Sequence, residues 1–425
     1  MPKSISIIGL GYVGLPLAVL CREKSLETKG FDTDKKKIAL IREGKSPIKD
    51  AWLESKSCLL KELNVSSKPE EVLSDSDVFI IAVPTPAKKT IPDLRPLKQA
   101  AETVSKFISK NSLVITESTI YPGTTEEIII PILEKSGLKA GRDFFIAHCP
   151  ERIDPGNKKF LLENIPRVLG ALTEQGAKKA LEFYAQILNS EIILLNNLKE
   201  AEAVKVVENT FRDINIAFVN ELAKSFDKMN IDLKQVIKGA ATKPFGFMPF
   251  YPGPGVGGHC IAQDPYYLIA RAKKSGFEHK FLKLARQINN SMPEYAVSLL
   301  ENTLKQKKIS VKTEKICILG VSYKPDVDDT RESPALKIIE ILKKKKAVLK
   351  IFDPLVPEQS NVSSVAEAVA GCSAVVLCTN HSKIISSLAP GLLKSSNVSV
   401  LIDTRNCLDK KAFEEKGIIY KGIGS

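Results

Sequence analysis

Cys260 is the residue whose type and surroundings most directly suggest covalent chemistry. It follows a stretch, 244–258, with five glycines and four prolines. That content excludes a helix or a central strand, because proline lacks a backbone donor and glycine loses the most entropy on ordering. Loops of this length are usually functional or disordered, and the aromatic residues here argue against disorder. We therefore expect a loop that delivers a candidate nucleophile, beside His259 and four residues before Asp264.

A thiol that attacks a carbonyl group creates an oxyanion, which needs a cation and an amide donor. The region 198–229 has no Gly or Pro and predicts one long helix. Lys205, Asn209 and Arg212 share one face of it at i, i+4, i+7 spacing. Such polar stripes are usually solvated surface. Lys205 and Asn209 are nevertheless candidates for binding the oxyanion, because they supply the cation and the amide donor that it needs. A second stripe of the same helix is apolar: Val204, Val207, Phe211, Ile214 and Phe218.

Asp264 has two interpretations that the sequence leaves open. With Pro265 at the first helical position and Gly276 at the end, it is a well-placed N-cap of a helix. Its distance of four residues from Cys260 also makes it a candidate acid–base group.

A glycine-rich turn near the N-terminus has the spacing of a dinucleotide-binding motif. The apolar run 4–8 leads into Gly9-Leu10-Gly11-Tyr12-Val13-Gly14, a helical pattern follows over 15–24, and Asp32 comes eighteen residues after Gly14. These features predict a pyrophosphate at a helix N-terminus with Asp32 on the ribose hydroxyls. An acid there favours NAD over NADP, although Lys35 to Lys37 weaken the preference; Lys37 is itself a candidate contact. The alternative is a turn that only packs a helix on a strand.

Further predicted strands end in polar turns, where open α/β sheets bind ligands. The strand 76–83 runs into Thr85, and the strand 113–118 ends at Ser118 and Thr119, so these three hydroxyls are cofactor or substrate candidates. Ordinary turn hydroxyls are the alternative. The strand 144–147 is followed by Glu151 and Arg152, a carboxylate and a guanidinium that a turn alone does not require.

The C-terminal part repeats the α/β pattern of the N-terminal part. The segments 315–320 and 348–353 read as strands, with a helix over 333–346 between them. No GxGxxG is present here; the first strand instead leads to a charged loop with Lys324 and Arg331. We expect an α/β protein with two Rossmann-like doubly wound domains joined by a central helical region. The second of these domains contributes side chains and binds no dinucleotide of its own.

Composition limits the class of protein. At 425 residues two or three domains are expected. No apolar run approaches the ~20 residues of a membrane span, so we expect a cytoplasmic protein. Eight dispersed cysteines without CxxC or metal-ligand spacing predict reduced thiols and no metal site. The net charge of +13 is spread over the sequence, which favours a lysine-rich solvated surface over nucleic-acid binding.

Taken together, these segments resemble the UDP-glucose/GDP-mannose dehydrogenase family over nearly the whole chain. The resemblance rests on 9–16, 117–125, 205–209, 257–260 with Asp264, and 324–331. It implies an NAD-binding domain (1–197), a central helical dimerisation region (198–308) and a UDP-sugar-binding domain (309–425), hence a homodimer. It also implies oxidation of a nucleotide-sugar C6 alcohol to a carboxylate with two NAD⁺. The segment Pro150-Glu151-Arg152-Ile-Asp-Pro155-Gly156 lacks the second glutamate of UDP-glucose enzymes and is similar to the UDP-N-acetylhexosamine branch. The loop 242–255 is similar to the UDP-N-acetylglucosamine enzymes in particular, although UDP-N-acetylmannosamine and UDP-glucose stay open as alternative substrates.

The resemblance also implies roles for individual residues. Cys260 would form a thiohemiacetal and then a thioester, with Lys205 and Asn209 on the oxyanion, and with Asp264, Glu151 and Thr119 handling protons. Arg331 would face the cofactor. The sugar nucleotide would meet a larger set: Glu151, Arg152, Lys205, Asn209, Arg212, Phe250, Tyr251, Gly257 and Lys324. A two-electron hydroxyacid dehydrogenase and a non-enzymatic NAD-binding regulator are the rival interpretations; neither explains Cys260 in its glycine-rich loop.

Overall fold

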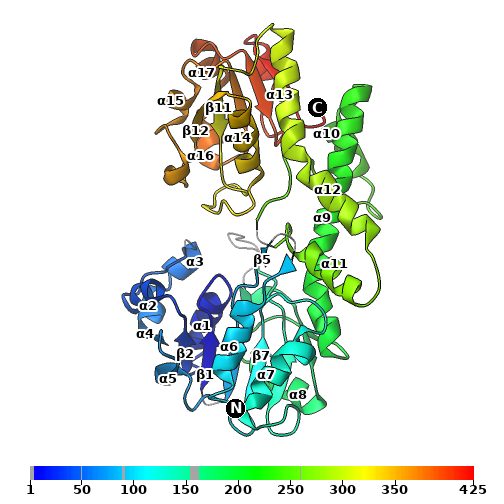
Figure 1. Cartoon of the computed structure of the whole chain (residues 1–425). Helices are drawn as coiled ribbons and strands as arrows, with labels where there is room; N and C mark the ends of the chain where they lie inside the picture. The colour runs from blue at the N-terminus through cyan, green and yellow to red at the C-terminus, as the bar shows by residue number, and fades with distance from the viewer. Residues whose placement is uncertain (1–3, 49, 89–90, 154–161, 259) are drawn as a thin grey trace. The chain divides into compact units, whose positions relative to one another are not determined.

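The structure, a computed structural model, describes residues 4–48, 50–88, 91–153, 162–258 and 260–425 (Figure 1). The chain forms two compact units. The first comprises residues up to Glu208 together with Tyr266–Phe277, and the second comprises Asn209–Pro265 and Glu278–Ser425. The boundary falls inside helix α9 (Leu198–Met229), whose bounds are those predicted for the long helix. The division of the chain into three segments stays a prediction.

The first unit is built on a mostly parallel sheet. Within the described residues it has eight strands in the order β10-β9-β8-β7-β4-β1-β2-β3, and only the β8–β9 pair is antiparallel. The stretch β3-β2-β1-β4-β7-β8 has the strand order of a dinucleotide-binding fold, with the order reversing beside β1. The strands are β1 Ile5–Ile8, β2 Thr28–Phe31, β3 Asn64–Ser66, β4 Val78–Ile81, β7 Leu113–Thr116, β8 Phe145–His148, β9 Arg167–Ala171 and β10 Ile192–Leu194. A separate small hairpin pairs β5 (Ala87–Lys88) with β6 (Ile91–Pro92).

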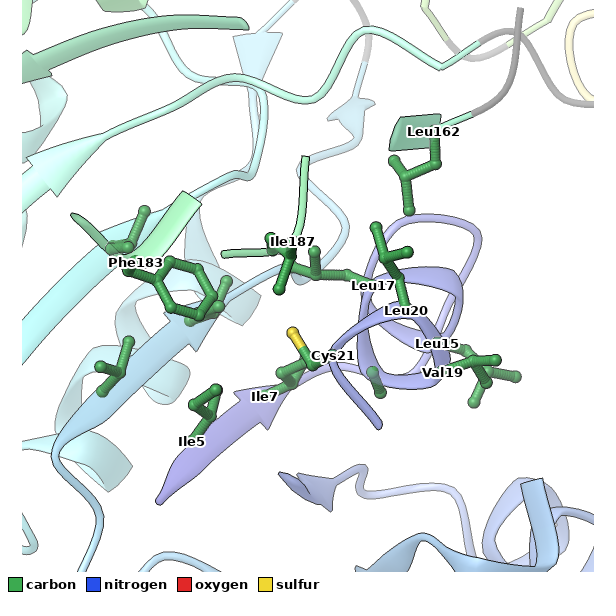
Figure 2. Packing of buried hydrophobic residues seen from close by; sticks show 14 of the residues in the cluster. Ile5, Ile7, Leu15, Leu17, Val19, Leu20, Cys21, Leu162, Phe183 and Ile187 are labelled. Carbon is green, nitrogen blue, oxygen red and sulfur yellow. The ribbon is translucent and has the colours of Figure 1, made fainter. Parts of the chain in front are cut away.

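The helices of this unit pack on the sheet through apolar faces. Figure 2 shows Cys21 of α1 among Ile5 and Ile7 of β1 and Phe183 of α8, in one buried cluster. Cys21 is a core residue, as expected for a thiol in an apolar run. The helices are α1 Gly14–Glu23, α2 Lys35–Arg42, α3 Ala51–Glu54, α4 Ser57–Glu62, α5 Pro69–Val72, α6 Arg95–Val104, α7 Ile130–Leu133 and α8 Glu174–Tyr184.

The second unit holds a parallel sheet of five strands among the residues described, in the order β12-β11-β13-β14-β15. This is the order of a second doubly wound fold, so the prediction of two Rossmann-like domains and a central helical region is confirmed. The strands are β11 Lys315–Leu319, β12 Val348–Phe352, β13 Ala374–Leu377, β14 Val400–Asp403 and β15 Ile419–Gly422. Its helices are α10 Leu233–Ala240, α12 Lys280–Asn290, α13 Met292–Gln306, α14 Pro334–Lys344, α15 Val365–Val369, α16 Ser382–Ser387, α17 Pro390–Ser395 and α18 Lys410–Glu414.

Helix α11 (Asp264–Lys274) begins at Asp264 itself, one residue earlier than an N-cap at that position would place it. The carbonyl of Cys260 accepts hydrogen bonds from the backbone N–H groups of Gln263 and Asp264, at 3.1 and 2.9 Å. Cys260 therefore lies in the turn that opens the helix. The interpretation of Asp264 as the N-cap residue is corrected accordingly: it is the first residue of the helix.

Candidate active site

Two of the three glycines in the first turn are required by the fold. A Cβ on Gly9, whose φ is +94°, would lie 2.6 Å from the carbonyl oxygen of Ala82. A Cβ on Gly14 would lie 1.9 Å from the carbonyl oxygen of Gly9. Gly11 differs, because an added Cβ would meet no atom within 4 Å and its φ is not in the left-handed region. The space beside Gly11 fits a pyrophosphate that approaches the backbone closely, so the residues present fit a dinucleotide.

Asp32 lies at the end of β2 and organises the same turn. Its Oδ2 accepts a hydrogen bond from the backbone N–H of Leu10 at 2.9 Å, and its Oδ1 accepts one from Asp34 at 2.9 Å. The ammonium of Lys37 lies 3.4 Å from Oδ2. Asp32 thus holds the glycine turn through its hydrogen bond to the backbone of Leu10. The side chain of Tyr12 in the same turn is exposed. The assignment of these residues to the cofactor stays a prediction.

The predicted strand-end hydroxyls bond mainly to the backbone. Ser118 Oγ accepts a hydrogen bond from the N–H of Val83 at 2.9 Å and donates one to the carbonyl of Val83 at 2.8 Å. Thr85 Oγ1 donates to the carbonyl of Thr119 at 2.7 Å. These contacts tie the end of β4 to the end of β7. The turn-hydroxyl alternative accounts for Thr85 and Ser118, whereas no such contact of the Thr119 hydroxyl is recorded in the described part of the chain.

Glu202 of α9 holds the turn after Thr119, a role that the sequence analysis missed. Its Oε1 accepts a hydrogen bond from the N–H of Thr125 at 2.8 Å, and its Oε2 accepts one from Gly123. Burial raises the pKa of Glu202 to about 7, although the bonds from Thr125 and Gly123 oppose this shift. A glutamate three residues before Lys205 in a long helix was the only signal in the sequence.

Glu151 lies directly after β8 with its side chain buried. Its Oε1 is 3.3 Å from the guanidinium of Arg167, a fully buried cation on β9 that the sequence analysis also missed. An arginine inside the apolar strand Arg-Val-Leu-Gly-Ala was a signal that could have found it. Arg152, predicted to bind substrate, instead pairs with Glu208 of α9 and donates to the carbonyl of Pro166 at 2.8 Å. Its substrate role stays a prediction.

Asn209 and Asp264, two of the predicted catalytic residues, are in direct contact. Asn209 Nδ2 donates a hydrogen bond to Asp264 Oδ2 at 2.5 Å, and both side chains are buried. This bond joins α9 to the first residue of α11, four residues after the exposed Cys260. Lys205 lies one turn before Asn209 and is half-buried, whereas Arg212 is exposed. The polar face of α9 is therefore not simply solvated surface.

A buried polar network fixes the glycine-rich loop that precedes Cys260. The N–H of Gly253 donates to Asn220 Oδ1 at 2.9 Å, and Asn220 Nδ2 donates to Asn289 Oδ1 at 2.9 Å. Asn289 Nδ2 in turn donates to Asp213 Oδ1 at 2.8 Å, and Arg286 forms an ion pair with the same carboxylate. Helices α9 and α12 thus hold the loop through side chains. This network has no local signal in the sequence, because its members are far apart along the chain.

The other end of the loop packs on the charged loop that follows β11. The N–H of Gly258 donates to the carbonyl of Arg331 at 2.9 Å, and a Cβ on Gly258 would lie 2.8 Å from the ring of Tyr323. A Cβ on Gly257 would lie 2.7 Å from Tyr323 Cβ. The predicted binding residue Gly257 therefore has a packing reason to be glycine. Arg331 also pairs with Asp329 at 2.6 Å.

The aromatic residues predicted to select the sugar have different environments. Phe250 packs edge-to-face on Phe211 with ring centroids 5.9 Å apart, and it contacts the core of its unit. Tyr251 is 57% exposed. Phe250 therefore has a structural role, while Tyr251 presents its ring to solvent and to any ligand.

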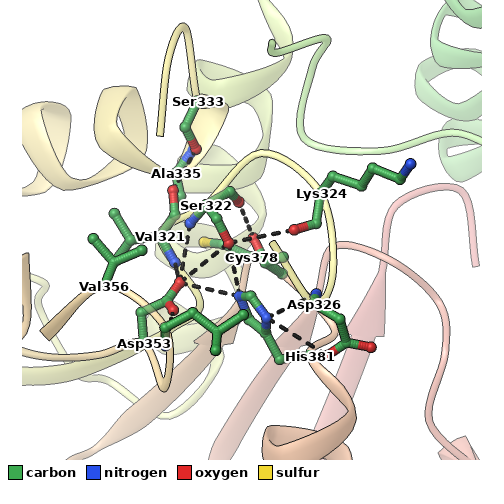
Figure 3. Close-up of polar contacts among 12 residues, drawn as sticks. Val321, Ser322, Lys324, Asp326, Ser333, Ala335, Asp353, Val356, Cys378 and His381 are labelled. Carbon is green, nitrogen blue, oxygen red and sulfur yellow. Dashed lines mark hydrogen bonds and ion pairs between the residues drawn. The ribbon is translucent and has the colours of Figure 1, made fainter. Parts of the chain in front are cut away.

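Figure 3 shows a buried cluster below the charged loop of the second sheet. His381 Nε2 lies 2.7 Å from Ser322 Oγ and 3.1 Å from Asp353 Oδ2, and its Nδ1 accepts the N–H of Asp326 at 3.0 Å. Burial favours the neutral form of Asp353, but His381 and backbone N–H groups hold its pKa well below its ordinary range. The side chain of Lys324 points away from this cluster. The cluster thus holds the backbone of the loop at Lys324 and Asp326, while the side chain of Lys324 lies outside the cluster.

No group of three potential metal ligands occurs among the described residues. None of the eight cysteines, all of which lie in described segments, forms a disulfide. Over the described ranges, no helix combines the length and the apolar content that crossing a membrane requires.

Comparison with known proteins gives consistent matches over the chain. Models of the UDP-glucose/GDP-mannose dehydrogenase family match in order: the NAD binding domain over residues 3–188, the central domain over 199–291 and the UDP binding domain over 317–410. The UDP-N-acetyl-D-mannosamine dehydrogenase of Pyrococcus horikoshii is 36% identical over 99% of both chains. The UDP-N-acetyl-D-glucosamine 6-dehydrogenase of Salmonella typhi is 41% identical over 83% of this chain and 82% of its own. A solved structure of UDP-D-ManNAc dehydrogenase from Pyrococcus horikoshii superposes with a TM-score of 0.93 at 36% identity, covering 99% of each chain.

Proposed function

Because the chain belongs to the UDP-glucose/GDP-mannose dehydrogenase family, we propose that it oxidises the C6 alcohol of a UDP-N-acetylhexosamine to the carboxylate. The coenzyme is NAD, to which the N-terminal domain of this family binds. The observation that carries the proposal is the buried Asn209–Asp264 hydrogen bond, which places an amide and a carboxylate at the start of the helix that Cys260 opens. A two-electron dehydrogenase has no use for a thiol at that point.

The reaction balances as two hydride transfers and one hydrolysis. Bound NAD⁺ would supply the oxidising power, as the hydride acceptor in each of the two oxidations. The first oxidation also releases the alcohol proton and leaves an aldehyde, to which the Cys260 thiolate adds; the resulting oxyanion takes up a proton to give a thiohemiacetal. Loss of the second hydride and of the hydroxyl proton gives a thioester, and water then releases the acid and the thiol. Covalent capture retains the reactive aldehyde and divides a difficult step.

The residues of this chain have separate tasks in that sequence. Asn209 donates to the oxygen that becomes anionic in the adduct, and Lys205 supplies a positive charge one helical turn away. Asp264 orients the Asn209 amide and accepts a proton, while Glu151 and Thr119 position the water that attacks the thioester. Lys324 and Arg331 bind the sugar nucleotide and the cofactor from the loop after β11.

UDP-N-acetylglucosamine is our preferred substrate, on the similarity of the loop 242–255. The segment 150–156, of which residues 154–156 lie outside the described residues, supports a UDP-N-acetylhexosamine without choosing between the epimers. UDP-N-acetylmannosamine is the second candidate, since relatives named for that sugar match this chain over nearly its full length. The two sugars differ at one centre, C2. Tyr251, exposed in the loop, is the described side chain that we expect to sense it.

The test is the stoichiometry of NADH formation followed at 340 nm with a panel of UDP-sugars. We expect two NADH per UDP-N-acetylglucosamine, and a Cys260→Ala variant that binds NAD but forms no uronate. Cys58→Ala is the matched control, because Cys58 is also exposed but lies on α4. One NADH per sugar, or full activity of Cys260→Ala, would contradict the thioester mechanism.

We also propose that the chain forms a homodimer through α9 and α12. The apolar stripe of α9 does not face the core of its own unit: Phe211 and Phe218 are 47% and 54% exposed. Phe281 and Leu284 of α12, which packs on α9 through the Arg286–Asp213 ion pair, are 64% and 51% exposed. Apolar side chains gathered on two packed helices suit a second copy of the chain.

Light scattering coupled to size exclusion tests the dimer. We expect Phe218→Glu to yield a monomer, because the carboxylate would be buried unpaired in the interface. Leu40→Glu on α2 is the control, since Leu40 is 37% exposed on a different helix and should leave the mass unchanged. A monomeric wild-type protein would overturn the dimer, and a dimeric Phe218→Glu variant would place the interface elsewhere.

A further inference from the structure

Helix α11 continues directly from the turn of Cys260, yet most of the helix packs on the N-terminal sheet and its turns. The residues Tyr266–Phe277 belong to the first compact unit, whereas Cys260 belongs to the second. The carbonyl of Cys260 accepts the N–H groups of Gln263 and Asp264, so this residue is hydrogen-bonded to the first residue of the helix. Whatever fixes the start of α11 therefore also limits where Cys260 lies.

One face of α11 makes the attachment. Tyr267, Arg271 and Lys274 follow one another at i, i+4, i+7 spacing and so share that face. The ring of Tyr267 packs edge-to-face on Tyr121, in the turn after β7, with ring centroids 6.4 Å apart. The ammonium group of Lys274 lies 5.6 Å from the centre of the Tyr121 ring. Arg271 Nη1 donates a hydrogen bond to Glu127 Oε2 at 2.7 Å. The same segment after β7 thus holds all three side chains.

Tyr267 differs from the other two residues because its side chain is fully buried and reaches the ends of the strands. Its hydroxyl donates a hydrogen bond to the carbonyl oxygen of Thr85, in the turn after β4. Thr85 Oγ1 donates in turn to the carbonyl of Thr119, after β7, at 2.7 Å. One hydroxyl therefore connects α11, through Thr85, with two strand ends at the carboxyl edge of the sheet, where a fold of this kind binds its dinucleotide.

The turn on which α11 packs is also held by α9. Glu202 Oε1 accepts the N–H of Thr125 at 2.8 Å, and the ammonium of Lys199 lies 2.7 Å from Glu126 Oε2. Because these contacts do not involve α11, they remain when the hydroxyl of Tyr267 is removed. Loss of that hydroxyl should therefore loosen the start of the helix and leave the turn in place.

We propose that Tyr267 is a positioning residue that fixes the start of α11, and through it the turn of Cys260, so that the thiol captures the aldehyde before the aldehyde escapes. This inference rests on the proposed function, in which the first oxidation leaves an aldehyde for Cys260. The role requires no contact of Tyr267 with the sugar or the cofactor.

A tyrosine that only stabilises the fold makes a different prediction. Loss of its hydroxyl would lower stability, because the carbonyl of Thr85 loses a buried donor, but every folded molecule would still complete both oxidations. If Tyr267 positions the thiol, folded molecules capture the aldehyde more slowly, since a displacement of about 1 Å can slow such a step by about a hundredfold. Part of the aldehyde then leaves after the first oxidation. Counting products separates the two roles.

The experiment counts NADH and free aldehyde per molecule of UDP-sugar consumed by the full-length enzyme, with semicarbazide present. A released aldehyde condenses with semicarbazide to a semicarbazone and water. It has yielded one NADH where the acid yields two, so NADH and semicarbazone together should number two per sugar. In Tyr267→Phe, which removes only the hydroxyl, we expect about 1.5 NADH or fewer, with semicarbazone making up the difference. Arg271→Met, one turn further along the same face, should shift the count in the same direction.

Hydrogen exchange of the NAD-free protein provides a second readout that needs no turnover. In Tyr267→Phe we expect the amides of residues 261–268 to exchange about tenfold faster than in the wild type. Tyr295→Phe is the matched control, because the hydroxyl of Tyr295 also donates one hydrogen bond, to Asp227 Oδ2 at 3.2 Å, but lies on α13 in the second unit. It should release no aldehyde and leave the exchange of residues 261–268 unchanged.

Aldehyde release together with faster exchange in Tyr267→Phe, and neither in Tyr295→Phe, supports the proposal. Two NADH per sugar in Tyr267→Phe overturns it and leaves the proposed function standing, and so does release without faster exchange, because the hydroxyl would then act by another route. If Tyr267→Phe does not fold, the product count of Arg271→Met decides in the same way. A wild type that forms no NADH, or only one per sugar, contradicts the proposed function itself.

Discussion

Gly11→Ala should remove NAD binding without harming the fold. The second glycine of the turn has no steric or conformational reason to be glycine in the protein alone, because an added Cβ meets no atom within 4 Å. At such a position alanine is expected to stabilise by ~0.4–1 kcal/mol, through the lower entropy of the unfolded chain. The same methyl group would stand where a pyrophosphate has to approach the backbone.

The neighbouring glycines provide the contrast. In Gly14→Ala the Cβ would lie 1.9 Å from the Gly9 carbonyl oxygen, so backbone must move and we expect destabilisation of ~1–3 kcal/mol or more. Gly9→Ala meets Ala82 and also requires a φ of +94° from alanine, which costs a further ~1–2 kcal/mol. Only Gly11→Ala separates ligand binding from folding.

Thermal unfolding with and without NAD measures both effects on the same sample. At a hundredfold excess over its Kd, NAD should stabilise the wild type by about 2.7 kcal/mol, and Gly11→Ala should lose this increment. Without NAD, its Tm should lie within about 4 °C of wild type. A Gly11→Ala variant that binds NAD as tightly as wild type in calorimetry would refute the assignment of this turn to the pyrophosphate.

Two further changes test the buried polar groups. Asn220→Ala leaves the Gly253 N–H without its acceptor. We therefore expect unfolding in urea to show ~1–3 kcal/mol lower stability, and NADH formation to be at least about tenfold slower. The control Ser225→Ala, at an exposed residue of the same helix, should change neither quantity. Glu117 has its pKa raised by burial from 4.5 to about 7, so its folded form holds a proton that the unfolded chain releases, and wild-type stability falls as pH rises through that window. Glu117→Gln should therefore gain on wild type by up to ~3 kcal/mol between pH 4.5 and 7, and a constant difference would contradict the shift.

The parts of the fold that were predictable are those determined by residues close together in the sequence. Helix α9 was predicted at its observed bounds because 32 residues without Gly or Pro admit little else. The turn 9–14 was predictable because Gly9 and Gly14 have a local packing reason to be glycine. The loop before Cys260 was predictable in the same way, since proline and glycine mark it without any knowledge of contacts.

The parts that were not predictable depend on pairs of residues far apart in the chain. Periodicity drew attention to the apolar stripe of α9, yet the structure buries Asn209, Asp213 and Asn220 and exposes Phe211 and Phe218. The polar residues are buried because partners from α12 and from the loop before Cys260 satisfy them. Helix α9 buries polar side chains on one side and exposes apolar side chains on the other. Its own sequence therefore cannot show which side faces the rest of the protein.

The two sheets share the conformation at the end of their first strands, but the turns that follow these strands differ. Gly9 and Gly320 each follow the first strand of their sheet with φ of +94° and +83°, and each donates its N–H to the end of the neighbouring strand, to Phe31 at 2.8 Å and Phe352 at 2.9 Å. Two residues further on, the first turn has Gly11 and the second has Ser322, whose hydroxyl bonds His381.

The aspartates at the ends of the second strands, Asp32 after β2 and Asp353 after β12, also differ in how many groups of the turn they bind. Asp32 Oδ2 accepts one backbone N–H from the turn, whereas Asp353 Oδ2 accepts those of Val321 and Ser322 at 2.6 and 3.0 Å and also lies against His381. The glycine with positive φ at the end of the first strand is present in both halves, whereas Gly11 has a serine in its place in the second half. The second half therefore has the fold of a dinucleotide domain with its turn closed by its own side chains, and it matches the UDP binding domain of the family.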